Sequence, residues 1–178
     1  MIIYHVAIST ADDYVARRAP HREAHLARLT ALRERSFVIG GGPAPDGASV
    51  DIIYRVQQVA DLTRLIEEDP YWMGGAWKAW HPRDFSQFLE PWEMAPVVTD
   101  GSRKATIVEG EAPDVEMASF ALIEARGGGR MAFGGFFPGG ATWALMRSPE
   151  AEGAMAELDA SGLWKPGSLR ARPLLHVL

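Results

Sequence analysis

The sequence of 178 residues contains no cysteine, which excludes disulfides, thiolate zinc sites and cysteine nucleophiles. It also has no excess of positive charge. The 23 acidic residues against 18 Lys and Arg give a formal net charge of -5, which disfavours nucleic acid as a partner. No apolar run approaches a membrane span, and the N-terminal stretch lacks a charged lead and a small-residue cleavage site. We therefore expect a cytoplasmic protein with neither a membrane nor a nucleic acid as its partner.

Hydrophobic residues make up 47% of the chain, enough to bury a substantial core. In the first half, the spacing of these residues alternates between the period of a strand and that of a helix. Strands are expected at residues 2–9, 37–41, 49–56 and 78–89, and helices at residues 21–35 and 59–69. The order βαββαβ is typical of an α+β, ferredoxin-like fold, in which two helices cover one face of an antiparallel sheet.

The second half repeats features of the first. Phe133-Gly134-Gly135 matches Ile39-Gly40-Gly41, and residues 117–125 are predicted to be the copy of the opening strand. Between these two segments lie only residues 126–130, which are too few and too rich in glycine for a helix. The second copy is therefore predicted to lack its first helix.

This repeat predicts the domain organisation. Residues 1–90 would form a ferredoxin-like domain, residues 91–113 a linker rich in Pro, Gly and charge, and residues 114–178 a degenerate second half. The two sheets are expected to pack into an α/β barrel, so that one chain forms a tandem pseudo-dimer. One site would be competent and the other vestigial. No obligate exchange of strands between chains is expected, and further homo-oligomerisation is left open.

His25 is the first candidate functional residue. At about 100° per residue, Leu29 and Leu32 lie within roughly 40° of His25 on the helical wheel. The imidazole therefore shares the core-facing side of its helix. A titratable ring in this position is either a structural residue with a satisfied partner or a catalytic residue, and the helix alone leaves both interpretations open.

Three motifs in the first half carry a family resemblance. They are Arg22 with Glu23-Ala24-His25-Leu26-Ala27-Arg28-Leu29, then Gly41-Gly42-Pro43, then Glu68-Asp69-Pro70-Tyr71 followed by Gly74-Gly75. In order and spacing they resemble the YciI-like (YCII-related) proteins. The resemblance implies a ferredoxin-like domain of the dimeric α/β barrel superfamily, with His25 and Asp69 as a dyad in a cleft. The chain departs from the family at Ser36-Phe37, where a glycine usually follows the helix.

The resemblance also suggests a type of chemistry. One similar enzyme eliminates chloride from a chlorinated hydroxyquinol, and related barrels include muconolactone isomerases and small monooxygenases that use no metal. A carboxylate that accepts a proton from one imidazole nitrogen fixes the tautomer and raises the basicity of the other nitrogen. His25 and Asp69 are therefore the predicted catalytic residues, acting in general acid/base chemistry.

Four residues are predicted to bind the substrate. Arg22, about one helical turn before His25, could hold a carboxylate, enolate or phenolate. Tyr71, Trp72 and Trp77 could line the pocket with flat apolar surface, which suits a small aromatic or unsaturated organic acid or ketone. The alternative interpretations are that Asp69 only caps a helix and that the tryptophans belong to the core.

Two main functions remain: a cofactor-free lyase or isomerase, and a non-catalytic protein that binds a small molecule in the same pocket. A cofactor-independent monooxygenase is a third. No metal or cofactor is predicted. His21 and His25 stand four residues apart on one helix, but an arginine stands between them, which disfavours a metal site, and neither glycine-rich run has the sequence of a phosphate loop.

Overall fold

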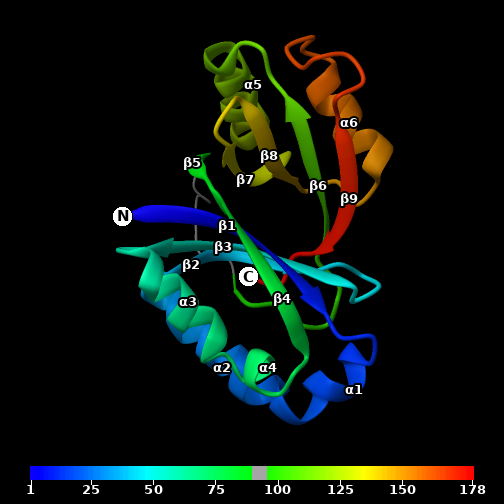
Figure 1. Cartoon of the computed structure of the whole chain (residues 1–178). Helices are drawn as coiled ribbons and strands as arrows, with labels where there is room; N and C mark the ends of the chain where they lie inside the picture. Colours follow the sequence, from blue (N-terminus) through cyan, green and yellow to red (C-terminus); the bar gives the residue numbers. More distant parts are fainter. Residues whose placement is uncertain (90–95) are drawn as a thin grey trace. The chain divides into compact units, whose positions relative to one another are not determined.

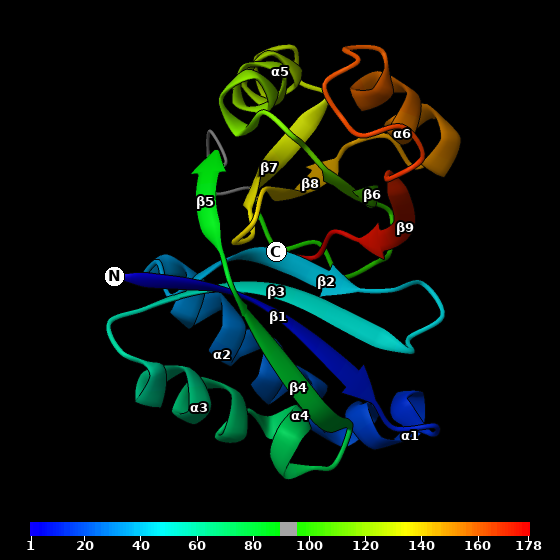
Figure 2. The ribbon, with the colours of Figure 1, turned by 45° about the horizontal axis from the view of Figure 1, so that its top comes forward.

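The computed structural model describes residues 1–89 and 96–178, which form two compact units. Unit 1 consists of Met1–Asp84, Pro96–Thr99 and His176–Leu178. Its elements are β1 (Ile2–Thr10), α1 (Tyr14–Arg18), the 3-10 turn η1 (Ala19–His21), α2 (Arg22–Glu34), β2 (Val38–Pro43), β3 (Ser49–Val56), α3 (Val59–Glu67), α4 (Pro70–Met73) and β4 (Trp77–Asp84). The antiparallel sheet has the order β2-β3-β1-β4, and the helices cover one of its faces (Figures 1 and 2). This is the ferredoxin-like arrangement expected from the sequence.

The core of unit 1 lies between the sheet and its helices. Alternate residues of β1, namely Tyr4, Val6 and Ile8, are buried in one cluster with Leu29 and Leu32 of α2. The period of two in the strand and of 3.6 in the helix bring these apolar side chains to the same layer. Fully burying one aliphatic side chain of this size contributes about 1.5–3 kcal/mol, so this layer fixes α2 on the sheet.

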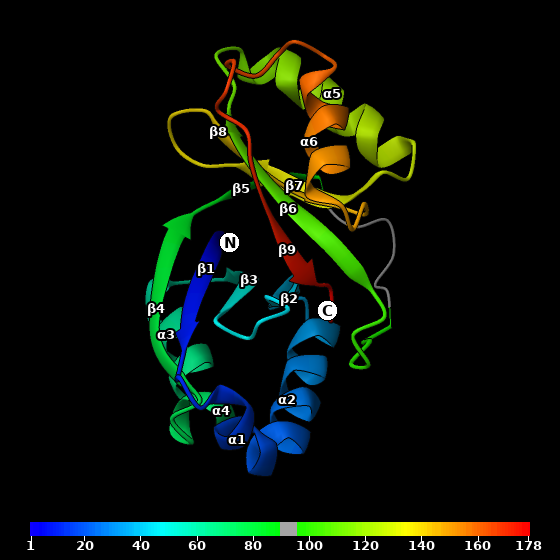
Figure 3. The ribbon, with the colours of Figure 1, turned by 90° about the vertical axis from the view of Figure 1, so that its right-hand side faces the viewer.

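The described residues of unit 2 are 85–89 and 100–175. Its elements are β5 (Ser86–Leu89), β6 (Lys104–Glu111), α5 (Val115–Gly127), β7 (Met131–Phe136), β8 (Ala141–Met146), α6 (Ala151–Asp159) and β9 (Arg170–Leu175). The sheet order is β5-β7-β8-β6-β9, with α5 and α6 on one face (Figure 3). Without β5, this order repeats that of unit 1, so the chain contains the predicted pseudo-repeat.

The registers of the two sheets confirm the repeat and refine it. A bulge in β2 follows the pair Val38 and Tyr54, and a bulge in β7 follows the pair Met131 and Met146. Counting onward from these bulges, Gly41 corresponds to Gly134. The match made from the sequence, which paired Gly40 with Gly134, was therefore shifted by one residue.

The prediction that the second copy lacks its first helix was wrong. Residues 117–125, expected as a strand, lie inside α5, which runs over 13 residues and is capped by the Asp114 side chain. The true copy of the opening strand is β6, which occupies residues that the sequence assigned to the linker. Helix α5 escaped recognition because Met117, Phe120 and Ile123 are exposed, so that apolar residues surround the helix and hide its period.

The domain boundaries change accordingly. The predicted linker at residues 91–113 contains β6 over residues 104–111, and its part at 91–95 lies outside the described residues. Residues 78–89, expected as one strand, are divided between β4 in the first sheet and β5 in the second. Residues 96–99 and 176–178 return to unit 1, where Val98 N donates to Val177 O and Val177 N donates to Gly41 O. Closure of the sheets into a barrel stays a prediction.

Among the described residues, no helix has the length and apolar character needed to cross a membrane.

Candidate functional site

The structure brings His25 of α2 and Asp69, the residue before α4, into direct contact. His25 Nδ1 lies 2.7 Å from Asp69 Oδ1, and the two residues are 6% and 0% exposed. A carboxylate is an acceptor, so Nδ1 is the nitrogen that carries the proton, and its N–H donates a hydrogen bond to Asp69. The contact joins residues 44 positions apart in the sequence. It places Nε2 on the opposite side of the ring, as the nitrogen that can exchange a proton with a ligand.

Local sequence explains why Asp69 adopts this position. Pro70 follows Asp69 and disfavours helical backbone there, so Asp69 is extended, with φ -70° and ψ 136°. Pro70 then begins α4, and the Asp69 side chain caps that helix by accepting a hydrogen bond from Tyr71 N at 2.9 Å. One oxygen, Oδ1, thus accepts from both His25 and the Tyr71 backbone. Asp69 therefore both caps α4 and pairs with His25, and the catalytic role of this pair stays a prediction.

Aromatic rings enclose the His25 imidazole. The Tyr71 ring is stacked on it, with centroids 3.7 Å apart and planes inclined by 11°. Trp77 meets His25 edge to face at 5.3 Å and Tyr71 at 5.9 Å. Tyr14 adds an edge contact to Tyr71 at 6.0 Å. In Figure 3, α1, α4 and the start of α2, which carry three of these four residues, lie together at one end of unit 1.

The enclosure changes the ionisation of the phenols. The pKa of Tyr71 is raised to about 12, mainly by burial and also by the Tyr14 and Asp69 groups, while the charges of Arg18 and Arg22 act in the opposite direction. Burial also raises the pKa of Tyr54 well above its usual value, and the Asp69 carboxylate adds to this. Both phenols therefore stay protonated at neutral pH and can donate hydrogen bonds.

Three buried polar atoms near the dyad have no hydrogen-bond partner among the described residues. They are Tyr54 Oη, Asp69 Oδ2 and Trp77 Nε1. A buried acceptor or donor without a partner costs about 1–3 kcal/mol. Such costs are concentrated in sites where a ligand or a reaction supplies the missing partner.

The structure brings together four of the six predicted site residues. His25, Asp69, Tyr71 and Trp77 form one contact group. Trp72 packs on the core of unit 1 as a partly buried residue, and no ring contact between it and His25 occurs among the described residues.

Arg22 lies at the start of α2 and is exposed. Its guanidinium Nη2 donates to Thr99 O at 3.2 Å, so one of its donors is already engaged. It still acts on the site through its charge, which lowers the pKa of Tyr71.

Sequence reasoning missed three residues of the site: Tyr14, Arg18 and Tyr54. Arg18 lies with its guanidinium carbon 4.9 Å from the centroid of the Tyr14 ring, and Tyr14 and Arg18 are four residues apart in one helix. That spacing was the available signal. Tyr54 alternates with Ile52 and Val56 on the helix-facing side of β3, and this pattern could have placed its phenol in the same layer as His25.

Tyr14 also lines a cavity of about 570 Å³ formed by residues 10–16 and 46–48. The rim carries the carboxylates of Asp12, Asp13 and Asp46, and the pKa of Asp13 is lowered mainly by its hydrogen bond to Arg17. Asp13 is paired with Arg17 and Asp12 with Lys78, so this side of the site carries only a small negative charge. Arg18 and Arg22 provide positive charge near Tyr71, so an anionic ligand is favoured on the arginine side.

A second buried histidine pair occurs on the other face of the same sheet. His5 Nε2 of β1 lies 2.7 Å from Asp51 Oδ1 of β3, with exposures of 1% and 2%. Alternate residues of each strand face the helices, so His5 and Asp51 point away from them. No local pattern in the sequence indicates this pair, because it joins two strands across the sheet.

The repeat shows what unit 2 has in place of the dyad. The same kind of hydrogen bond ends both helices: Phe37 N donates to Leu32 O after α2, and Arg130 N donates to Ala125 O after α5. When the two helices are superimposed on this bond, His25 corresponds to Ala118. In the same way Asp69 N to Ile66 O and Ser161 N to Leu158 O align Asp69 with Ser161. Neither partner is kept, so unit 2 has no dyad at this position.

No group of three or more histidine, aspartate or glutamate side chains suited to a metal ion occurs in residues 1–89 and 96–178.

Solved structures resemble this chain in fold. A Lactobacillus acidophilus protein provisionally described as a monooxygenase matches 99% of this chain and 94% of its own, with a TM-score of 0.65 and 10% identity. A Fusobacterium nucleatum protein with the same description matches 99% and 92%, with a TM-score of 0.59 and 5% identity. At these identities the likeness establishes the fold alone, which is the α+β fold of the dimeric α/β barrel proteins.

A 5-chloro-2-hydroxyhydroquinone dehydrochlorinase from Burkholderia phenoliruptrix matches 53% of this chain and 96% of its own, at 17% identity. Its TM-score of 0.41 is too low to define a shared fold. No family model matches the chain, and no curated protein matches its sequence.

Proposed function

We propose that unit 1 carries a general acid/base site of the YciI-like type, and that the protein is a cofactor-free lyase or isomerase. The substrate would be a small aromatic or unsaturated organic acid or ketone, and the reaction an elimination or a proton shift. The observation that carries the proposal is the buried His25–Asp69 hydrogen bond of 2.7 Å beneath a stacked tyrosine ring.

Each residue has a role in this proposal. Asp69 fixes the imidazole tautomer and stabilises the imidazolium that forms when Nε2 takes a proton. Tyr71 and Trp77 hold the ring and provide apolar surface, and the protonated Tyr71 hydroxyl can donate to a developing oxyanion. Arg18 and Arg22 supply the positive charge that attracts an anionic substrate. Histidine acid/base groups typically contribute about 10²–10⁴ in rate.

A cofactor-independent monooxygenase is the second candidate, because two structures with this fold carry names that describe a monooxygenase. In such a reaction the substrate itself would supply the electrons, and His25 would remove the proton from its hydroxyl group. A binding protein without turnover would use the same rings and arginines but leave the substrate unchanged.

One experiment separates the three functions. Aromatic acids, quinols and unsaturated ketones are incubated with the protein in D₂O, and ¹H NMR follows exchange at carbon and product formation while an electrode records dissolved oxygen. A lyase or isomerase exchanges or converts a substrate without consuming oxygen, and His25→Ala slows this by about 10²–10⁴. Conversion that consumes oxygen identifies the monooxygenase. Line broadening without exchange or conversion identifies the binding protein and refutes the enzyme proposal.

A further inference from the structure

A polar groove lies between α2 and α3 on the helical side of unit 1. We call it the α2–α3 groove, and its principal lining residues are Arg28, Leu32, Arg35, Phe37, Leu65 and Glu68. Its volume is about 430 Å³. Leu32 is buried, and Leu65 and Phe37 are partly buried and packed on the core, so the groove has an apolar floor. It lies outside the contact group of His25 and belongs entirely to one unit.

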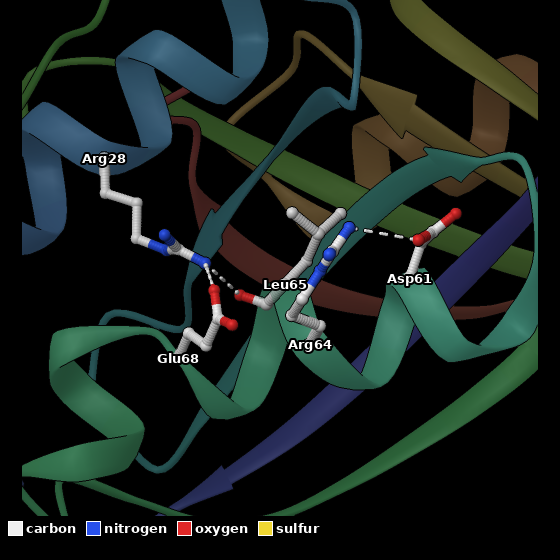
Figure 4. Close-up of polar contacts among 5 residues, drawn as sticks. All are labelled: Arg28, Asp61, Arg64, Leu65 and Glu68. Atoms are coloured by element: carbon white, nitrogen blue, oxygen red, sulfur yellow. Dashed lines mark hydrogen bonds and ion pairs between the residues drawn. The ribbon is translucent and has the colours of Figure 1, made fainter.

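Positive charge exceeds negative charge around the groove. Three arginines, Arg28, Arg35 and Arg64, stand against two carboxylates, Asp61 and Glu68. Arg64 is paired with Asp61 in its own helix at 3.1 Å, as Figure 4 shows. This pair leaves two guanidinium groups for a single carboxylate.

Arg28 is held only weakly by the protein. Its Nη2 lies 3.4 Å from both Leu65 O and Glu68 Oε2, well beyond the 2.7–2.9 Å typical of a charged pair (Figure 4). Its Nε is buried and has no acceptor among the described residues. Nε therefore lacks an acceptor and Nη2 has only two long contacts, so the guanidinium is left with unused hydrogen-bonding capacity for a carboxylate.

Arg35 provides the second charge. Its guanidinium carbon lies 4.9 Å from the centroid of the Phe37 ring, and the residue is exposed. It has no carboxylate partner and no side-chain hydrogen bond among the described residues. Residues 28, 32 and 35 are separated by four and three positions, so Arg28 and Leu32 of α2 and Arg35, its C-cap residue, form one stripe with a leucine between two arginines.

We propose that the α2–α3 groove is a second ligand site, which binds a small organic anion with a carboxylate head and a flat apolar body. The head would accept from Arg28 and Arg35, and the body would lie on Leu32, Phe37 and Leu65. This site is independent of the His25–Asp69 dyad and of the reaction proposed for it.

The test uses the full chain labelled with ¹⁵N and titrated with benzoate. Saturable shifts are expected at the amides of Leu32, Phe37 and Leu65. Arg35→Gln is the main variant, because Arg35 is exposed and its loss leaves the core intact. Loss of a charge-assisted hydrogen bond is expected to weaken benzoate about tenfold or more, and Arg28→Gln should have a similar effect. Benzamide, which lacks the charge, should not bind at the same concentrations.

Arg130→Gln serves as the matched control, since it removes one positive charge from an exposed arginine in unit 2 and should leave binding unchanged. The proposal is refuted if the groove amides show no saturable shift, or if Arg35→Gln binds benzoate as tightly as the wild type. Shifts confined to His25 and Tyr71 would also refute it, because they would place benzoate at the dyad. Those shifts would leave the proposed function of the dyad intact, so the two proposals can fail separately.

Discussion

The imidazole of His25 lies parallel to the ring of Tyr71, with centroids 3.7 Å apart and planes inclined by 11°. Asp69 explains this arrangement, because one of its oxygens accepts from His25 Nδ1 and from the Tyr71 backbone nitrogen. The carboxylate thus positions both rings. With one face against Tyr71 and one edge on Asp69, the imidazole cannot rotate freely, and Nε2 keeps a fixed direction. A fixed proton acceptor requires little reorganisation during a reaction.

Asp69→Ala should lower the free energy of unfolding by about 2–4 kcal/mol, since it removes a helix cap and leaves a buried histidine donor without its acceptor. Asp69→Asn should cost less, because an amide oxygen can accept both hydrogen bonds. Urea unfolding of the three proteins measures these differences.

Asp114→Ala is the matched control for that series. Asp114 caps α5 by accepting from Met117 N at 3.0 Å and has no histidine partner, so its loss should cost only the cap, about 0.5–2 kcal/mol. Equal losses for the two alanine variants would contradict a stabilising His25–Asp69 bond.

The raised pKa of Tyr71 predicts that the protein loses stability at alkaline pH. An unfolded tyrosine ionises near pH 10, whereas burial raises the pKa of Tyr71 in the folded protein to about 12. Below about pH 10 both states keep the proton, and stability is unaffected. Between about pH 10 and 12 the unfolded state loses its proton first, so the free energy of unfolding falls as pH rises. Urea unfolding at about pH 8 and about pH 11 should show a smaller loss for Tyr71→Phe than for wild type. Equal losses would mean that the hydroxyl is not shielded.

Ser36 should be a site of stored strain. With φ 60° it is the one non-glycine residue with positive φ in residues 1–89 and 96–178, and it follows the end of α2. The equivalent position after α5 is Gly129, with φ 73°. A left-handed backbone costs a residue with a side chain about 1–2 kcal/mol, partly offset by the greater entropy that glycine loses. Ser36→Gly should therefore stabilise the protein by about 0.5–1 kcal/mol in thermal or urea unfolding.

The reverse change, Gly129→Ser, is the control for Ser36. No atom lies within 4 Å of a Cβ placed on Gly129, so only the backbone term should act, and the variant should lose stability. If both substitutions changed stability in the same direction, backbone conformation would not be the cause.

The dyad was predictable because local signals and a family pattern agreed. The apolar spacing of Leu29 and Leu32 placed His25 on the inner face of α2, and the Asp69-Pro70 step fixed the end of α3 and the start of α4. The pairing of distant strands could not be predicted from the sequence. The His5–Asp51 pair and the separation of β4 from β5 depend on sheet register, which no local pattern in this chain specifies.

The second half of the chain was harder to predict, because its local sequence patterns conflict with its fold. Helix α5 has apolar residues on its buried and exposed sides. With Met117 and Phe120 exposed, the helical period is hidden, and the segment was predicted to be a strand. Strand β6 lies among prolines, glycines and charges typical of a linker. The repeat was found through its glycine corner, where the close approach of Gly41 and Gly134 to neighbouring backbone permits no side chain. The structures of α5 and β6 are decided by packing against the rest of unit 2, which no local pattern shows.

The central claim is that His25 transfers protons with the help of Asp69, and the steady-state rate of the converted substrate tests it most directly. His25→Ala should lower kcat by about 10²–10⁴, and Asp69→Asn should lower it substantially while the protein keeps both hydrogen bonds of Oδ1 and its fold. Circular dichroism and urea unfolding verify the fold of each variant. Full turnover by folded His25→Ala would contradict the account and leave His25 with a structural role.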